Sequence, residues 1–271
     1  MDEILNHWRD WQTLAGASDR TIDERAGVIR HLVSHSGAST LDVDQRHIVA
    51  YLARKGLKSS SRATYHATIR AHFTFLMAPS LRTDDPSAGI PTPRRERGVP
   101  RPVPTDGLVR MLTIVNRKRG RMMILLGALA GLRVHEIAKV HDDDVDHERQ
   151  ALRVTGKGGH TALIPLHDLI LDLVPTVGGA GYWFPSPTPG REHVTRSAVY
   201  SSIAGVMRRA GLDTTPHQLR HWFGTSLVEA DVNLRVVQEL MRHASPSTTA
   251  IYSAVRLDQR AAGISLLKLA A

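Results

Sequence analysis

Cationic side chains occur inside otherwise apolar helical stretches of this chain. Arg133 lies in one such stretch, and His217 and Arg220 lie three residues apart in another. A spacing of three places two side chains on the same face of a helix. The planar guanidinium of arginine offers donors that suit phosphate oxygens, and histidine transfers protons near neutral pH. Together these residues would suit chemistry at a negatively charged group such as a phosphate.

Three further side chains that could take part in a reaction lie elsewhere in the chain. Lys157, one of six lysines beside 29 arginines, lies among glycines at residues 156–159, and Tyr252 follows His243 by nine residues. Taken one at a time, each has a structural explanation, because single histidines and arginines are usually hydrogen-bonded parts of the fold and tyrosines usually pack. A function can therefore be inferred only from the whole set and its order.

As a set, these residues resemble the signature of the tyrosine recombinases, the family of the phage integrases and Xer recombinases. The order Arg, Lys, His-x-x-Arg, His, Tyr runs from residue 133 to residue 252. The resemblance rests on Gly131–Ile137 (a first arginine box), Thr155–Gly159 (a β-hairpin lysine), His217–His221, Gln238–Ser245 and Ser247–Tyr252. Six ordered positions with matching local context make a specific signal.

The resemblance implies a role for each matched residue in cutting a phosphodiester bond. Tyr252 would be the nucleophile that forms a 3′-phosphotyrosine. Arg133 and Arg220 would bind the phosphate, whose charge grows in the transition state. Lys157 would be the general acid for the leaving 5′-hydroxyl. The phosphotyrosine conserves the energy of the bond for rejoining, so no ATP is needed. By resemblance the reaction also needs no cofactor and no metal.

The remaining matched residues would support these groups. By resemblance, His217 and His243 would donate hydrogen bonds to the phosphate and assist proton transfer at Tyr252. Glu136 matches the acid that holds the first arginine in place. Two departures from the family pattern stand out: the hairpin continues with uncharged residues after Gly159, and Arg242 replaces a common glycine before His243.

The sequence also limits other kinds of site. The chain has no cysteine, which excludes disulfides, thiol catalysis and thiolate metal sites. His217 and His221 have the i,i+4 spacing of a helical zinc site, but the glutamate of the His-Glu-x-x-His motif is missing, so we predict no metal. We predict that Trp222 and Phe223 are core aromatics rather than base-stacking residues.

Apolar periodicity predicts a mainly α-helical fold around these residues. Two β-prone segments, 151–155 and 160–166, flank the glycines at 156–159 and predict an antiparallel hairpin with Lys157 at its tip. The expected helices cover residues 2–14, 21–36, 44–55, 59–77, 105–117, 119–130, 196–210, 217–230, 234–242, 247–253 and 257–269.

A basic, proline-rich segment at residues 91–104 predicts a linker, since it holds five prolines and four arginines. It would separate a four-helix domain at residues 1–90 from a mostly helical domain with a small antiparallel sheet at residues 105–271. The resemblance implies that the first is a SAM-like core-binding domain and the second the catalytic domain, which ends in a tail helix. Many phage integrases carry a further N-terminal arm-binding domain, but we expect this chain to begin directly in the core-binding helices.

Net charge indicates a polyanionic partner, since 35 basic and 26 acidic residues give a formal charge of +9. An alternative explanation for the many arginines is a GC-rich genome, which favours arginine codons. By resemblance the partner is double-stranded DNA carrying core or attachment sites. The expected DNA contacts are Arg54, Lys55, Lys58, Arg62, Arg70, Arg94 and Arg95.

The resemblance implies a homotetramer on DNA, with a directionality factor as accessory partner. The apolar segment 264–269 would dock onto a neighbouring protomer, or else within its own chain. Apolar runs such as residues 122–130 are shorter than the ~20 residues of a membrane span, and the N-terminus begins no signal peptide. We therefore expect no membrane partner. We expect the protein to lie in the cytoplasm of a host bacterial cell, associated with the nucleoid.

Four functions fit this pattern to different degrees. The leading hypothesis is a phage-type integrase that integrates and excises a mobile element. A host Xer-type recombinase that resolves replicon dimers would share every matched residue. A type IB topoisomerase uses similar chemistry, but the two-domain layout and the tail argue against it. An inactive DNA-binding regulator would have no use for the complete residue set.

Overall fold

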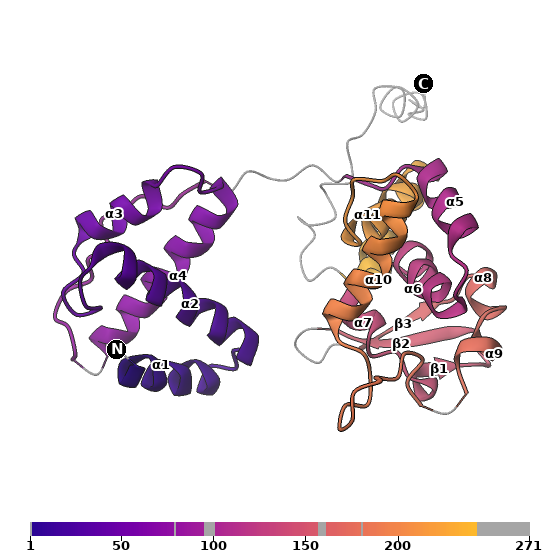
Figure 1. The fold of residues 1–271 in the computed structure, drawn as a ribbon, viewed down its shortest axis with the longest axis horizontal. Helices are drawn as coiled ribbons and strands as arrows, with labels where there is room; N and C mark the ends of the chain where they lie inside the picture. The colour runs from indigo at the N-terminus through magenta and orange to yellow at the C-terminus, as the bar shows by residue number, and fades with distance from the viewer. Residues whose placement is uncertain (1, 79, 95–100, 157–160, 180, 243–271) are drawn as a thin grey trace, which may run out of the picture. The chain divides into compact units, whose positions relative to one another are not determined.

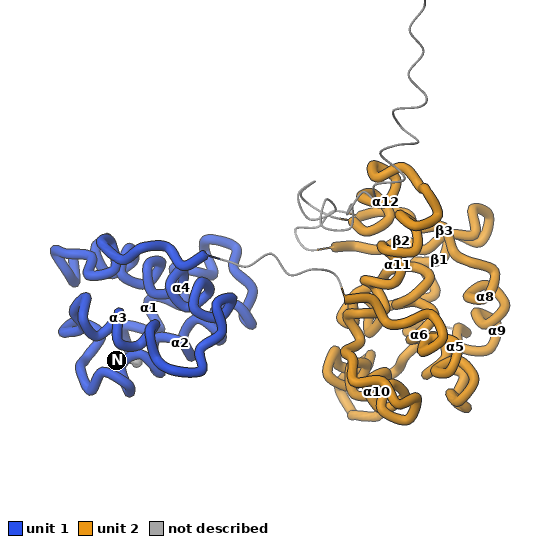
Figure 2. The backbone as a smooth tube through the Cα atoms, turned by 90° about the horizontal axis from the view of Figure 1, so that it is seen from above, with its two compact units in different colours: residues 1–97 blue, residues 98–271 orange. Residues whose placement is uncertain are grey.

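The computed structural model divides the chain into two compact units, residues 1–97 and 98–271 (Figures 1 and 2). It describes all residues except 1, 79, 95–100, 157–160, 180 and 243–271. The ends of the predicted linker belong to the units beside it. Ser59 donates a hydrogen bond to the carbonyl of Arg94 in the first unit, and Val103 is buried in the core of the second.

The described residues of the first unit form four helices. Ser18 caps the second helix by accepting a hydrogen bond from the amide of Thr21, and Gly37 ends it in the left-handed conformation, which glycine adopts without strain. The four helices predicted from the sequence are present with boundaries that shift by two residues at most. They are α1 (Asp2–Leu14), α2 (Asp19–Ser36), α3 (Gln45–Ala53) and α4 (Ser59–Met77).

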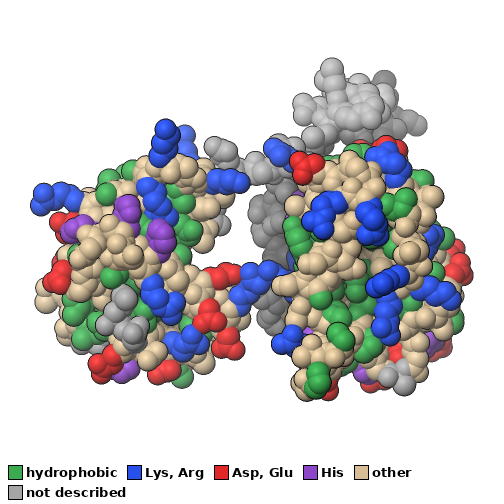
Figure 3. All heavy atoms as spheres, in the orientation of Figure 1, with side chains coloured by type: hydrophobic (Ala, Val, Ile, Leu, Met, Phe, Trp, Pro, Cys, Tyr) green, Lys and Arg blue, Asp and Glu red, His purple; other side chains and the backbone are tan. Residues whose placement is uncertain are grey.

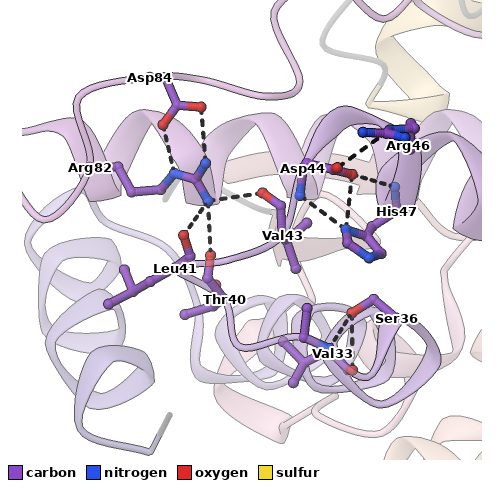
Figure 4. Close-up of polar contacts among 11 residues, drawn as sticks. Val33, Ser36, Thr40, Leu41, Val43, Asp44, Arg46, His47, Arg82 and Asp84 are labelled. Atoms are coloured by element: carbon purple, nitrogen blue, oxygen red, sulfur yellow. Dashed lines mark hydrogen bonds and ion pairs between the residues drawn. The ribbon is translucent and has the colours of Figure 1, made fainter.

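Arg82 joins the chain after α4 to the connection between α2 and α3 (Figure 4). One guanidinium nitrogen donates to the carbonyls of Thr40, Leu41 and Val43 at 3.5, 2.7 and 2.9 Å. The other two bind the Asp84 carboxylate at 3.0 and 2.9 Å. Because the fork satisfies three carbonyls and one carboxylate at once, it fixes this end of the unit.

His72 is a fully buried histidine in the core of the first unit. Its Nε2 lies 2.7 Å from the hydroxyl of Thr40, and its ring meets the edge of Trp8 at 4.6 Å between centroids. Burial lowers the pKa of His72 from 6.5 to about 4. The imidazole is therefore neutral in the folded protein at physiological pH.

This buried histidine should make the protein lose stability in mild acid. The unfolded chain binds a proton at His72 near pH 6.5, whereas the folded chain binds one only near pH 4. The contribution of the neutral His72 to the free energy of unfolding is therefore complete above pH 6.5 and is lost as the pH falls toward 4. The shift corresponds to about 3 kcal/mol. Urea unfolding between pH 4 and 7.5 should show a flatter profile for His72→Gln than for wild type. His7→Gln, at an exposed histidine of α1, is the control; equal slopes for wild type and His72→Gln would contradict this assignment.

The second unit is mostly helical, with a small antiparallel sheet in the order β1-β2-β3. Arg153 pairs with Leu163 and Thr155 with Thr161, so the predicted hairpin is present, although its tip at Lys157 lies outside the described residues. The elements are α5 (Thr105–Ile114), α6 (Lys118–Leu129), α7 (Val134–Ile137), the 3-10 turn η1 (Asp142–Asp144), β1 (Val145–Asp146), β2 (Ala151–Thr155), β3 (Thr161–Pro165), α8 (Asp168–Leu171), α9 (Val174–Val177), α10 (Arg196–Arg209), α11 (His217–Glu229) and α12 (Leu234–Met241).

Helix α6 forms the centre of this unit. Every residue from Met122 to Ala128 is buried, which explains the uninterrupted apolar run in the sequence. Helix α11 packs against it so closely that a Cβ at Gly127 would lie 3.1 Å from Leu219. As predicted, Phe223 is buried, and Trp222 packs against the core while donating to the hydroxyl of Thr105 at 3.0 Å. The functional part of α11 is thus fixed by the main core.

Among the described helices of both units, none combines the length and the hydropathy needed to cross a membrane.

Candidate active site

The first arginine box is built on a turn that strongly favours glycine. After α6, Gly131 has φ of +60°, and Leu132 closes the turn by donating to the carbonyl of Leu126 at 3.0 Å. A Cβ at Gly131 would lie 2.5 Å from a ring carbon of Phe223. Both the conformation and the lack of space disfavour a side chain here. The turn places Arg133 directly before the first residue of α7.

Arg133 is held by the buried carboxylate of Glu136. Its Nη1 donates to one carboxylate oxygen at 2.9 Å and its backbone amide to the other at 2.7 Å. Burial alone would raise the pKa of Glu136, but the charges of Arg242, Arg133 and Arg220 hold that pKa below its usual value. Glu136 is therefore ionised, and it fixes an arginine whose side chain remains 33% exposed.

Arg220 is almost completely buried at the start of α11, with 2% exposure. Its guanidinium donates to the carbonyl of Gly131 and to the carbonyl of Met241, the last residue of α12. One side chain thus connects the turn before α7, the helix α11 and the end of α12. The position of this cation depends on all three elements.

His217 is the first residue of α11 and lies on the same side as Arg220. Its ring meets the edge of the His221 ring at 4.7 Å between centroids. Desolvation, followed by the charges of Arg220 and Arg133, lowers the pKa of His217, and burial lowers that of His221 to about 4. Both imidazoles are therefore neutral at physiological pH. In the part of the chain that the structure describes, no three potential metal ligands gather.

Arg133 and His217 both line an open pocket of about 450 Å³. Helix α10 also lines this pocket, with residues that include Arg196 and the exposed Tyr200. The pocket therefore presents a fixed guanidinium and a neutral imidazole to solvent. Such a site can bind an anion through the arginine and exchange a hydrogen bond or proton through the histidine.

The structure brings together four of the predicted site residues: Arg133, Glu136, His217 and Arg220. The other three, Lys157, His243 and Tyr252, lie outside the described residues. One contributor was not identified from the sequence as a site residue: Arg242 donates to Glu136 at 2.8 Å. Its only signal in the sequence was the unusual replacement of a glycine.

The residues predicted to contact DNA divide into two groups. Arg62 donates to the carbonyls of Leu52 and Leu57 at 2.8 and 3.2 Å, and Arg54 lies over the ring of Tyr51 at 3.8 Å. These two guanidinium groups therefore have contacts inside the first unit. Exposed basic side chains occur on both units (Figure 3). Of the predicted contacts, the exposed ones are Lys55, Lys58, Arg70 and Arg94, and Arg95 lies outside the described residues.

Replacing Gly131 with alanine should destabilise the second unit by about 2–4 kcal/mol, since a left-handed alanine and overpacking each cost energy. The reason is that the added Cβ would lie 2.5 Å from Phe223, at a residue with φ of +60°. Gly211→Ala is a matched control, because Gly211 has φ of +72° and nothing within 4 Å of its Cβ position. Urea unfolding should show a clearly larger loss for Gly131→Ala. Equal losses would mean that Phe223 imposes no constraint.

Comparison with known proteins identifies the family. Residues 103–258 match the model of the phage integrase family. The chain is 28% identical to the tyrosine recombinase XerA of Thermococcus kodakarensis over 95% of this chain and 92% of the relative. Among solved structures, it is 39% identical to the integrase of mycobacterium phage Brujita, with a TM-score of 0.53 and coverage of 98% and 92%.

A second solved structure supports the fold. A lambda integrase dimer bound to a core site is 18% identical, with a TM-score of 0.74, and covers 92% of this chain and 96% of its own. The family match spans the segment that holds the first arginine box, the hairpin and α11, where the site was found. The chain therefore belongs to the phage integrase family of tyrosine recombinases, enzymes that cut and rejoin DNA strands.

Proposed function

We propose that this recombinase is a phage-type integrase, which integrates and excises a mobile element through a 3′-phosphotyrosine on Tyr252. The observation that carries the proposal is the meeting of Arg133, Glu136, His217 and Arg220 around one turn, with Arg133 and His217 at a shared pocket. The 39% identity to a phage integrase over 98% of the chain favours the integrase role.

The geometry suits binding of a scissile phosphate. Arg133 is fixed from behind by Glu136 and exposes the rest of its fork, so it can bind non-bridging oxygens without reorganising during the reaction. Arg220 adds a buried cation whose field is poorly screened by solvent. A neutral His217 can donate a hydrogen bond or accept a proton. We assign Lys157 as general acid and His243 as a second phosphate ligand from the sequence pattern.

The assembly is proposed from the relatives. One solved lambda integrase is a dimer bound to a core site, and another is a tetramer bound to a Holliday junction. We infer that this chain binds double-stranded core sites with both units and acts as a homotetramer joined by its C-terminal tail. A directionality factor would select excision. The proposed site of action is the bacterial nucleoid in the cytoplasm.

A covalent trapping experiment tests the function. The core site is first selected by binding of the full chain to a pool of random duplexes and is then prepared with a nick beside the cleavage position. Loss of the short strand prevents rejoining, so a protein–DNA adduct should accumulate in EDTA and survive denaturation. Digestion and mass spectrometry should place the nucleotide on the peptide that contains Tyr252. The absence of an adduct, or a requirement for a divalent ion, would contradict the proposal.

A host Xer-type recombinase is the second candidate function, favoured by the XerA relative at 28% identity over 95% of the chain. The chemistry would be the same, so the trapping experiment does not separate the two. The sequence of the selected core site does. An integrase site should recur at the junctions of a mobile element, whereas an Xer site should lie once per replicon.

A further inference from the structure

Arg242 has an unusual backbone conformation for a residue with a long side chain. It follows the last residue of α12 with φ of +52° and ψ of +47°, in the left-handed region that favours glycine. Its side chain is nevertheless only 7% exposed. A strained backbone that carries a buried charged group persists only where the surrounding contacts stabilise it.

The backbone amide of Arg242 donates to the carbonyl of Glu239 at 3.0 Å, and the guanidinium makes the contacts beyond α12. One terminal nitrogen donates to the carboxylate of Glu136 at 2.8 Å and to the carbonyl of Gly131 at 3.2 Å. The other donates to the carbonyl of Leu240 at 3.1 Å. The side chain therefore ties the end of α12 to the turn that carries Arg133.

The electrostatics make this attachment specific. Burial lowers the pKa of Arg242, and the charge of Glu136 raises it, so the buried cation depends on this one carboxylate. Glu136 in turn binds Arg242 through the oxygen that also accepts from the backbone amide of Arg133. A change at residue 242 is thus expected to reach Arg133 through this shared oxygen and through the carbonyl of Gly131, which also accepts from Arg242.

We propose that Arg242 is a positioning residue, which holds the turn that carries Arg133 against the end of α12. This inference rests on the proposed function, in which Arg133 binds the scissile phosphate. Arg242 acts through the Glu136 carboxylate and the Gly131 carbonyl, which it contacts directly.

Three variants separate positioning from strain and from general stability. Arg242→Gly removes the guanidinium and also the backbone strain, so the fold is expected to persist. Arg242→Lys keeps one cation that can reach Glu136 but lacks the fork that also reaches Gly131. Arg235→Ala is the matched control, because Arg235 is an exposed arginine of the same helix that pairs only with Glu239 among the described residues.

The first readout is the rate of covalent adduct formation at saturating nicked core-site DNA. Arg242→Gly should be about 10- to 100-fold slower than wild type, as expected for misplaced reacting groups. Its dissociation constant for DNA should be unchanged, and Arg242→Lys should be intermediate. Arg235→Ala should match wild type, since exposed ion pairs contribute little. A wild-type rate in Arg242→Gly, or an equal loss of rate and DNA affinity, would overturn the proposal.

The second readout does not depend on activity. Hydrogen exchange of the free protein should show faster exchange in the peptide spanning residues 131–137 for Arg242→Gly, while peptides from the first unit remain unchanged. Unchanged exchange at 131–137 would overturn the coupling even if adduct formation slowed. If wild type formed no adduct, the proposed function would fail, and this readout alone would decide whether Arg242 positions the turn.

Discussion

Tyr252→Phe should form no covalent adduct with nicked core-site DNA, while it binds that DNA as tightly as wild type. The substitution removes only the hydroxyl oxygen, which is the attacking atom in the proposed reaction. Phosphate contacts from many basic residues supply most of the affinity, so binding does not depend on this oxygen. Denaturing gels measure the adduct, and a gel-shift titration measures the dissociation constant.

The structure supplies a demanding control for this experiment. Tyr200 is 44% exposed and lines the same pocket as Arg133 and His217, so its hydroxyl is the alternative tyrosine nucleophile among the described residues of that pocket. Tyr200→Phe should retain adduct formation. If Tyr200→Phe lost the adduct and Tyr252→Phe retained it, the assignment of the nucleophile would be wrong.

The second large effect is expected for Arg133→Ala and Arg220→Ala. Both substitutions should slow the reaction, but they should differ in their effect on stability. Arg133→Ala should slow adduct formation by about 10²–10³-fold, as for loss of one transition-state donor. It should cost little stability, because Glu136 keeps its bonds to the residue 133 amide and to Arg242. Single-turnover rates and thermal unfolding of the same samples test this combination.

Arg220→Ala should lose both rate and stability. The side chain is 2% exposed and serves the carbonyls of Gly131 and Met241, which would lose these donors. The Gly131 carbonyl would keep the bond from Arg242 at 3.2 Å. A buried carbonyl that loses its donor costs about 1–3 kcal/mol, so the loss at Met241 should shift unfolding by several degrees. If Arg133→Ala were the less stable variant, the larger structural role would belong to Arg133 and not to the buried Arg220, which would contradict this prediction. Both variants should keep most of their affinity for DNA.

The sequence predicted the long elements well because their apolar pattern is strong. Helices α1 and α4 have the predicted boundaries, and α6 was visible as an uninterrupted apolar run. The short elements were missed for a physical reason. Helix α7 has four residues and β1 has two, too few for a period to appear, and their geometry depends on packing in the second unit.

The candidate site was only partly visible in the sequence. The spacing of His217 and Arg220 places them on one face of α11, and Glu136 was matched to Arg133 through the family pattern. The contribution of Arg242 could not be predicted, because its contact with Glu136 joins residues 106 positions apart. The sequence marked it only as a departure from a glycine, and the left-handed φ explains why glycine is the ordinary choice there.

The anchoring of Val103 has a practical consequence for building chimaeric recombinases. Val103 is 1% exposed, its amide donates to the carbonyl of Gln218 at 3.3 Å, and two residues later Thr105 accepts from Trp222. These contacts attach the start of the second unit to the helix that carries His217. A fusion that replaces the first unit should therefore join the two proteins within residues 95–100. A junction at Thr105 would remove Val103 together with the first unit, and the helix that carries His217 would lose this contact.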